Sequence, residues 1–208
     1  FLLIEAFILT VFSTLDLVVF YVFFESVLIP IFYIVGIWGT RDRKVRAGYL
    51  FFLYTLLGSL FILLGIIIIF IETGTTDYIV LLENTFSFNK QKFLWLAFFL
   101  SFATKVPIIP AHIWLPEAHV EAPTGGSVIL AGILLKLGTY GFLRFSLPLF
   151  PLASIYFRPL IFVISSIAVI YTSITALRQT DIKRVIAYAS VAHINLTIAG
   201  VFSFSFTG

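Results

Sequence analysis

The sequence predicts an all-α fold, a polytopic bundle of transmembrane helices, on three observations. Hydrophobic residues make up 61% of the 208 positions, and charged residues make up only 11%. A soluble domain of this size has too little interior to bury so many apolar side chains. The apolar residues also gather in runs of about 20, the length at which an α-helix crosses a bilayer.

Six apolar segments are long enough to span the membrane. In chain order they are residues 16–38, 47–71, 93–113, 127–147, 159–177 and 185–206. The first dozen residues are apolar but too short to span alone, and residues 13–16 look like a turn followed by a helix start. Because the chain begins with Phe1 and contains no methionine, we expect a fragment or a split gene product whose first helix is truncated.

Much of the positive charge lies in two short basic loops, residues 40–46 and 178–184. Four predicted crossings separate the loops, so both should lie on one face of the membrane, the cytoplasm or the matrix by the positive-inside rule. Residues 72–92 should lie on the opposite face. This placement favours membrane orientation over nucleic-acid binding, so the expected partners include membrane lipids and no nucleic acid. The chain has no cysteine, which excludes disulfides, thiolate metal sites and iron–sulfur ligation within it.

Four ionisable side chains fall near the middle of the predicted spans: Glu25, Lys105, Lys136 and His193. Charge inside a bilayer is costly, so such residues are rare and usually functional. Their similar depth predicts a row across the membrane plane, through which protons would move with water between the groups. The alternatives are structural: an ion pair between Glu25 and one of the lysines, and a neutral histidine bonded to a backbone carbonyl.

Two prolines, Pro107 and Pro110, follow Lys105 at once. Each lacks an N–H group and clashes with the carbonyl four residues earlier, so the helix should break or kink just after Lys105. Broken helices with an ion site at the break occur in transporters, where the freed backbone lines a cavity. We expect water at the break to give Lys105 a proton path; a simple packing kink is the alternative.

Four more titratable residues follow the break: His112, Glu117, His119 and Glu121. They flank prolines and match no trusted metal-ligand spacing, so no metal is expected. A proton-collecting entrance and a structural loop remain equally open.

Residues 105–145, KVPIIPAHIWLPEAHVEAPTGGSVILAGILLKLGTYGFLRF, are similar to the signature segment of the subunit 4 family of respiratory complex I, the proton-translocating NADH:ubiquinone oxidoreductase. FYVFFESVLIPIF around Glu25 and RVIAYASVAHINL around His193 also resemble this family, in the same order. Thr104 departs from the pattern, because an aliphatic residue is expected there. Such subunits are antiporter-like and contain two inverted five-helix repeats, each with a broken helix.

The resemblance implies an organisation and a role for each site residue. Residues 1–147 would form the first five-helix repeat, with a truncated first helix, and residues 148–208 would begin the second. Glu25 and Lys105 would form the interacting pair of the first half-channel. Lys136 would be the central relay, and His193 would link it to the second half-channel.

The resemblance also implies partners and a location. No cofactor is expected in this chain, since flavin, iron–sulfur clusters and quinone would belong to other subunits. Other membrane-arm subunits of complex I, including antiporter-like neighbours, would be partners. A second polypeptide, or further residues, would complete the second repeat. The expected location is the mitochondrial inner membrane, with the bacterial plasma membrane as the alternative.

Two other functions remain open. A subunit of a multisubunit cation/proton antiporter would share Lys105 and Lys136 but differ around residues 117–121. A non-catalytic scaffold fragment is the third possibility, although it would have no reason to keep four charges at one depth in the membrane.

Overall fold

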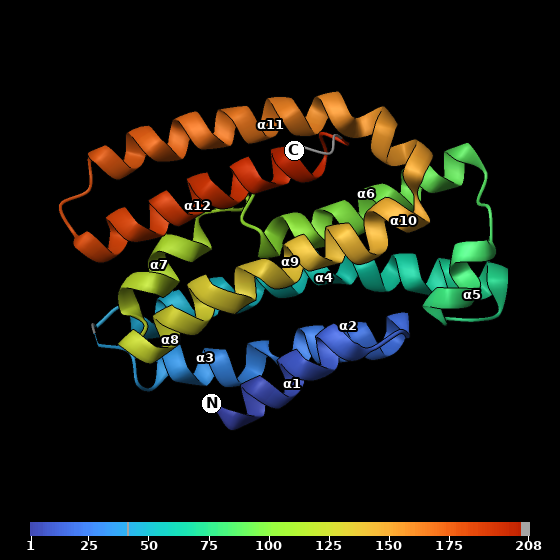
Figure 1. Cartoon of the computed structure of the whole chain (residues 1–208). Coiled ribbons are helices and arrows are strands. Elements are labelled where there is room, and N and C mark those ends of the chain that lie inside the picture. Colours follow the sequence, from blue (N-terminus) through green and yellow to red (C-terminus); the bar gives the residue numbers. More distant parts are fainter. Residues whose placement is uncertain (41, 205–208) are drawn as a thin grey trace.

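The computed structural model describes residues 1–40 and 42–204, which form helices joined by short loops (Figure 1). The α-helices are α1 (Leu2–Ser13), α2 (Leu17–Ser26), α3 (Leu28–Gly36), α4 (Lys44–Thr73), α5 (Tyr78–Glu83), α6 (Phe88–Lys105), α7 (Trp114–Glu121), α8 (Thr124–Ile129), α9 (Leu135–Gly141), α10 (Leu147–Leu149), α11 (Pro151–Leu177) and α12 (Ile182–Val201). Two π-helical segments, Leu130–Leu134 and Phe142–Ser146, join α8, α9 and α10 into one continuous helix.

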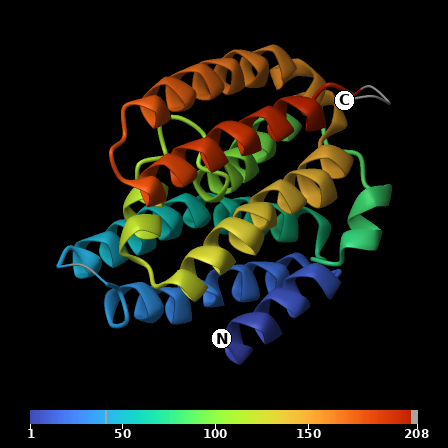
Figure 2. The same cartoon turned by 60° about the vertical axis from the view of Figure 1, so that its left-hand side comes forward.

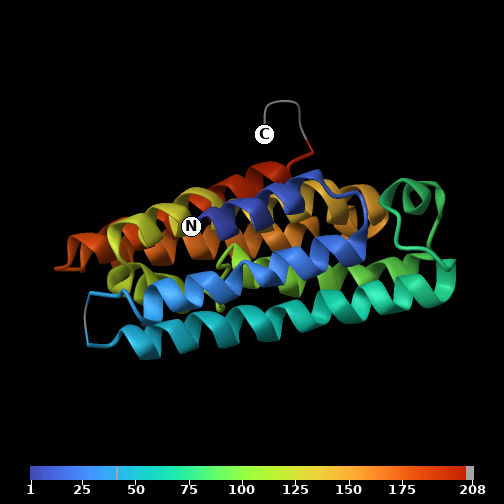
Figure 3. The same ribbon diagram turned by 90° about the horizontal axis from the view of Figure 1, so that it is seen from below.

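The long helices lie along a common axis, in the arrangement expected for a membrane bundle (Figures 1 and 3). Helices α1 to α3 form one side, and the antiparallel pair α11 and α12 forms the other (Figure 1). Helices α4 and α6 and the continuous helix from α8 to α10 lie between these sides. Figure 2 shows the α8–α10 helix passing between the α1–α3 side and α12.

Among the described residues, five helices are long and apolar enough to cross a membrane: Leu17–Gly36, Lys44–Thr73, Thr124–Leu149, Pro151–Leu177 and Ile182–Val201. They correspond to five of the six expected segments, which confirms the all-α polytopic fold class. Within the described residues, the largest boundary difference is at the start of the fifth segment. The expected start at residue 159 is wrong, because α11 begins at Pro151 and carries Pro159 in its interior. The expected start was placed just after Arg158, because this charge interrupts the apolar run. The helix nevertheless includes Arg158 and begins seven residues before it. The expected end at residue 206 lies outside the described residues.

The sixth expected segment, residues 93–113, is interrupted after Lys105, where the two prolines predict a break. Helix α6 ends at Lys105, and α7 begins only at Trp114. The prolines explain the interruption, because Pro107 and Pro110 cannot donate the N–H bonds that would continue the helix.

The turn expected near residues 13–16 is confirmed and is tied to a second corner of the chain. Asp16 caps α2 by accepting hydrogen bonds from the amides of Val18 (2.8 Å) and Val19 (3.0 Å). Its other carboxylate oxygen accepts a 2.6 Å hydrogen bond from the Thr76 hydroxyl. The α1–α2 corner is thereby fixed to the loop after α4, which turns at Gly74 with a positive φ of 73°.

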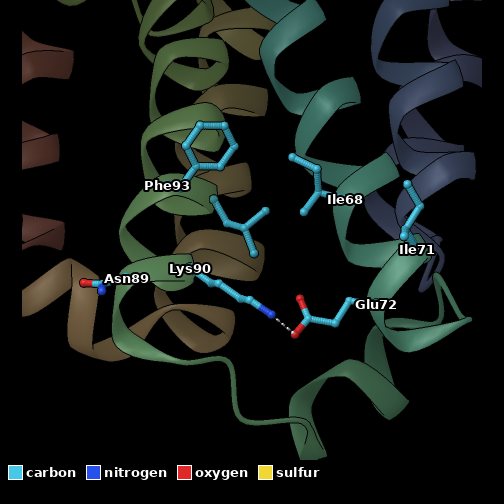
Figure 4. Close-up of a pocket in the computed structure, with 7 residues that line it drawn as sticks. Ile68, Ile71, Glu72, Asn89, Lys90 and Phe93 are labelled. Carbon is cyan, nitrogen blue, oxygen red and sulfur yellow. Dashed lines mark hydrogen bonds and ion pairs between the residues drawn. The ribbon is translucent and has the colours of Figure 1, made fainter.

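The two basic loops lie at the same end of the bundle, and α5 lies at the opposite end (Figure 1). Arg43 from the first loop and Arg184 from the start of α12 line one open cavity. The even number of crossings between the loops is therefore confirmed. At the opposite end, Lys90 of α6 forms a 2.6 Å ion pair with Glu72 of α4, beside the apolar side chains of Ile68 and Phe93 (Figure 4).

Aromatic side chains fill the interior between the helices. The largest fully buried side chains include Phe20, Phe24, Phe51, Phe98, Phe102, Phe142, Phe145 and Phe150. Rings of α2, α6 and the α8–α10 helix meet edge to face or tilted, with centroids 4.5 Å apart for Phe20 and Phe145 and 5.3 Å apart for Phe102 and Phe142. This packing encloses the end of α6, where Lys105 lies.

Candidate functional site

Lys105 is buried in the bundle and meets a carboxylate there. It is 1% exposed, and its Nζ lies 3.6 Å from a carboxylate oxygen of Glu25, which is itself largely covered. Neither Glu25 oxygen accepts a hydrogen bond of normal geometry from the described residues. The structure thus brings together two of the four expected site residues. An ion pair between Glu25 and a lysine was also one of the structural alternatives considered from the sequence.

The α2 backbone and an aromatic ring complete the surroundings of the Lys105 ammonium group. Nζ donates a 3.4 Å hydrogen bond to the carbonyl of Phe24 and lies 4.4 Å from the centre of the Phe24 ring. The helix is interrupted at Val27, between α2 and α3. Pro30 follows three residues later, and its ring disfavours a regular helical turn before it. The carboxylate, carbonyl and ring together compensate a charge that would otherwise be costly to bury.

Carbonyls freed by the break in α6 find protein donors. The Thr104 carbonyl accepts a 2.8 Å hydrogen bond from the Trp114 indole, and the Ala103 carbonyl accepts one from the Ile108 amide. The Pro107 carbonyl accepts a long, 3.5 Å hydrogen bond from the Asn195 side chain of α12. The break is therefore held by α7 and α12, as buried backbone groups require.

Lys136 and His193 form a second group of site residues, and their exposure differs from expectation. Both line a cavity of about 320 Å³ between the α8–α10 helix and α12, together with Thr139, Ser190 and Thr197. Both side chains are exposed in this chain, so the expectation of four buried groups is wrong for these two. Lys136 donates a 2.5 Å hydrogen bond to the Ala131 carbonyl in the π-helical segment.

Helix α9 crosses the end of α6 at close range. A Cβ atom on Gly138 would meet Val106 and lie 3.3 Å from the Cβ of Lys105. Only a glycine permits this close crossing, which places the backbone of α9, two residues after Lys136, against Lys105.

The titratable residues after the break lie apart from the buried pair. His112, His119 and Glu121 are buried, and Glu117 lies 3.8 Å from Arg184 of α12. Lys183 donates a 3.0 Å hydrogen bond to the Ala122 carbonyl just after them. These contacts fasten α7 to α12 at the end that carries the basic loops. Within the described ranges, no group of three His, Asp or Glu side chains is placed to hold a metal ion.

Two residues near Glu25 were missed by the sequence analysis, Tyr21 and Ser59. Tyr21 lies one helical turn before Glu25 in α2, and the fully buried Ser59 hydroxyl of α4 donates a 2.8 Å hydrogen bond to the Leu56 carbonyl. The available signals were the spacing of Tyr21, one helical turn before Glu25, and a serine within an apolar span.

A buried lysine beside a buried carboxylate can exchange a proton when the pair opens or closes. Separating the two charges removes the attraction that favours the ionised form of each group. At 3.6 Å the pair is ionically coupled but lies beyond the 2.6–3.2 Å range of direct proton transfer. A small movement would bring the two groups within that range, and one water could bridge them.

Comparisons with known proteins point to one family. Residues 14–208 match the family model described as NADH:quinone oxidoreductase/Mrp antiporter, TM. The chain is 63% identical to NADH-ubiquinone oxidoreductase chain 4 of Marchantia polymorpha and 64% identical to that of Arabidopsis thaliana. Each match covers 100% of this chain and 42% of the relative. The chain thus spans about two fifths of the length of these relatives.

Two solved structures have the same fold. A chain of respiratory complex I from Thermus thermophilus with bound NADH matches with a TM-score of 0.89 and 35% identity, over 96% of this chain and 43% of that chain. A chain of the Mrp complex from Dietzia sp. DQ12-45-1b matches with a TM-score of 0.86 over 96% of this chain and 22% of that chain. Its 23% identity supports a likeness of fold alone. On the match of the family model, which covers nearly the whole sequence, the chain belongs to the NADH:quinone oxidoreductase/Mrp antiporter transmembrane family.

Proposed function

We propose that this chain is part of a proton-translocating membrane subunit of NADH:ubiquinone oxidoreductase, in which Glu25, Lys105, Lys136 and His193 transfer protons. The observation that carries the proposal is the buried Lys105–Glu25 pair at the end of a broken helix. A purely structural ion pair gains little net stability in an apolar interior, so its burial favours a functional role.

The geometry supports an order of events. When Glu25 moves away from Lys105, the lysine loses the charge that stabilises its protonated form and releases a proton. The backbone of α9 passes the end of α6 at Gly138, and Lys136, two residues earlier in α9, is the next acceptor that we assign to the path. Lys136 and His193 share one polar-lined cavity, where water would connect them.

Energy for this transfer would come from other subunits. Moving one charge against 100 mV costs about 2.3 kcal/mol, which the redox chemistry of flavin, iron–sulfur clusters and quinone elsewhere in the complex would supply. We assign no cofactor to this chain. Its partners would be other membrane-arm subunits, among them antiporter-like neighbours, and membrane lipids.

We also propose the internal organisation and the location. Residues 1–147 belong to a first five-helix repeat and residues 148–208 begin a second, which further residues or a second polypeptide would complete. The mitochondrial inner membrane is favoured over the bacterial plasma membrane by the higher identity to the Marchantia and Arabidopsis proteins than to the Thermus chain. The cation/proton antiporter alternative is less favoured, because the Mrp likeness is one of fold alone.

One experiment tests the proposed function in the assembled complex. Lys105→Met removes the buried ammonium group, and Lys90→Met removes an exposed one from the same helix as a matched control. We expect Lys105→Met and Lys136→Ala to stop proton translocation while the complex still assembles, and Lys90→Met to pump normally. Mass spectrometry of the intact complex, with NADH:quinone activity stained on the same native gel, checks assembly. Normal pumping by both Lys105→Met and Lys136→Ala, or migration of the chain with small exchanger subunits lacking NADH oxidation, would overturn the proposal.

A further inference from the structure

The buried face of α12 carries one amide, Asn195, among apolar side chains. Asn195 has no exposed surface, and it lies in the row of side chains by which α12 packs on the bundle. The other buried members of this row, at the spacing of one helix face, are Ala187, Val191, Ile194 and Ile198. His193 projects from the opposite side of α12, toward the cavity that it shares with Lys136.

The side-chain amide of Asn195 reaches the break that follows Lys105. It donates a 2.8 Å hydrogen bond to the Val191 carbonyl, one turn earlier in α12, and a longer, 3.5 Å hydrogen bond to the Pro107 carbonyl. Pro107 lies two residues after Lys105, and α12 runs beside the segment that joins α6 to α7 (Figure 1). One side chain thus links α12 to a backbone group of the break that lies 88 positions away in the sequence.

The backbone around Lys105 is held by three different helices. Val106 packs so closely against Gly138 of α9 that a Cβ atom at that position would meet it. The Trp114 indole of α7 binds the carbonyl just before Lys105, and Asn195 supplies the contact with α12. Because a side chain projects from its own backbone, these contacts determine how the ammonium group approaches the carboxylate of α2, 3.6 Å away.

The amide at position 195 has a cost that packing alone does not explain. Among the described residues, its Oδ1 atom has no hydrogen-bond partner, although it is buried. A buried acceptor without a partner destabilises a fold, whereas a leucine of similar size would fill the same space with no unpaired atom. The amide is therefore better explained by the carbonyl that it binds than by the volume that it fills.

We propose that Asn195 is a positioning residue for proton transfer at Lys105, because its bond to the Pro107 carbonyl ties the end of α6 to the helix that carries His193. The inference rests on the proposed function and adds to it a residue that itself carries no proton. A movement of α12 would be transmitted through this contact to the break, and from there to the distance between Lys105 and Glu25.

Two substitutions separate the amide from its shape. Asn195→Leu removes the amide with little change in size, and Asn195→Gln keeps the amide on a longer side chain. Thr172→Val is the matched control, since Thr172 is equally buried in α11 and its hydroxyl donates a 2.7 Å hydrogen bond to a carbonyl of its own helix. In the assembled complex, Asn195→Leu should slow proton translocation by about tenfold to 10²-fold, the effect of a small misplacement of a reacting group. Asn195→Gln should recover part of the rate, and Thr172→Val should pump normally.

Infrared difference spectroscopy provides a readout that a merely structural amide would not move. The carboxyl band of Glu25, identified by its loss in Glu25→Gln, should shift in Asn195→Leu because Lys105 is displaced. Glu25 lies on α2 and has no contact with Asn195 among the printed hydrogen bonds of either residue, so a defect confined to α12 would leave the band in place.

The outcomes distinguish this inference from the proposed function. Normal pumping in Asn195→Leu, or slow pumping with an unshifted Glu25 band and no recovery in Asn195→Gln, overturns the positioning role. Either result, obtained while Lys105→Met stops pumping, leaves the proposed function standing. Normal pumping by both Lys105→Met and Lys136→Ala would instead overturn the proposed function.

Discussion

Lys105 and Glu25 are tolerated in the interior because each compensates the other. Removing one partner leaves an uncompensated charge in an apolar environment, which typically costs about 3–5 kcal/mol, whereas replacing both with neutral groups of similar shape is often neutral. The Phe24 carbonyl and ring further stabilise the charge of Lys105, but not that of Glu25. The pair is therefore a coupled unit.

This coupling predicts the outcome of a double-mutant cycle. Lys105→Met should lower the thermal stability of the complex by an amount corresponding to about 3–5 kcal/mol, and Glu25→Gln with Lys105→Met should recover most of it. Proton translocation should stay absent in the double variant. Thermal inactivation and pumping, measured on the same preparations, check both points. Additive losses of stability would show that the two side chains do not interact.

Asp16 predicts a pH dependence at the α1–α2 corner, outside the spans. Burial raises the pKa of Asp16, but hydrogen bonds from Thr76 and from the amides of Val19 and Val18 lower it by more, so the net shift is downward. A lowered folded-state pKa stabilises the fold above the unfolded value, about 3.9, and this contribution is lost as pH falls through the folded pKa. Asp16→Ala should destabilise the corner by about 0.5–2 kcal/mol at neutral pH.

Hydrogen exchange at the amides of Val18 and Val19 measures this cap directly. Exchange should accelerate in Asp16→Ala at neutral pH and much less in Asp16→Asn, which keeps one acceptor oxygen. Equal protection in all three proteins would contradict the capping role.

At the scale of helices, the break between α6 and α7 depends on partners far along the chain. The Trp114 indole, fully buried, satisfies a carbonyl that the break frees. Trp114→Phe keeps most of the ring but leaves the Thr104 carbonyl unpaired, which should cost about 1–3 kcal/mol and loosen the segment between the helices. Faster exchange of residues 106–113, with α11 unchanged as the internal control, is the expected result. Unchanged exchange of residues 106–113 would mean that the prolines alone maintain the break.

The ion pair at the other end of α6 should matter far less. Lys90 and Glu72 are both exposed, and pairs of that kind contribute about 0–1 kcal/mol. Lys90→Ala should therefore leave thermal stability almost unchanged at high salt and lower it only slightly at low salt. A loss comparable to that of Lys105→Met would mean that this contact organises the helix pair.

Local rules explain why the helix break could be predicted and the exposure of the site residues could not. Proline chemistry acts within four residues, so Pro107 and Pro110 alone locate the end of α6. The approach of Glu25 to Lys105 depends on helix packing between residues 80 positions apart. Their similar depth in the membrane only limited which ionisable residues could pair. Ser59 looked like one small residue in an apolar span, because a serine carries no charge that marks it. The exposure of Lys136 and His193 depends on which helices pack beside α9 and α12, and the local sequence pattern does not specify these neighbours.

At the scale of the whole molecule, one lateral face carries polar groups that lipid would not accept. Lys136 and His193 are exposed there at the middle of apolar helices, beside Thr197. A lysine exposed to hydrocarbon at the centre of a helix costs about 2.5–3.5 kcal/mol. We therefore predict that protein covers this face in the assembled complex, in agreement with a chain that spans about two fifths of its relatives' length.

The absence of cysteine makes this prediction easy to measure, because any introduced thiol reports on one position. Thr197→Cys reports on the polar face, and Ile170→Cys, at an exposed apolar site of α11, is the matched control. In the assembled complex, a membrane-soluble maleimide should label position 197 at least about tenfold more slowly than the same position in the isolated chain in lipid, since a covered thiol is closed to the reagent. A photo-crosslinker at position 197 should join this chain to another protein segment. Rapid labelling at position 197, with crosslinks only to lipid, would mean that Lys136 and His193 face the bilayer, and the relay through them would then have no continuation.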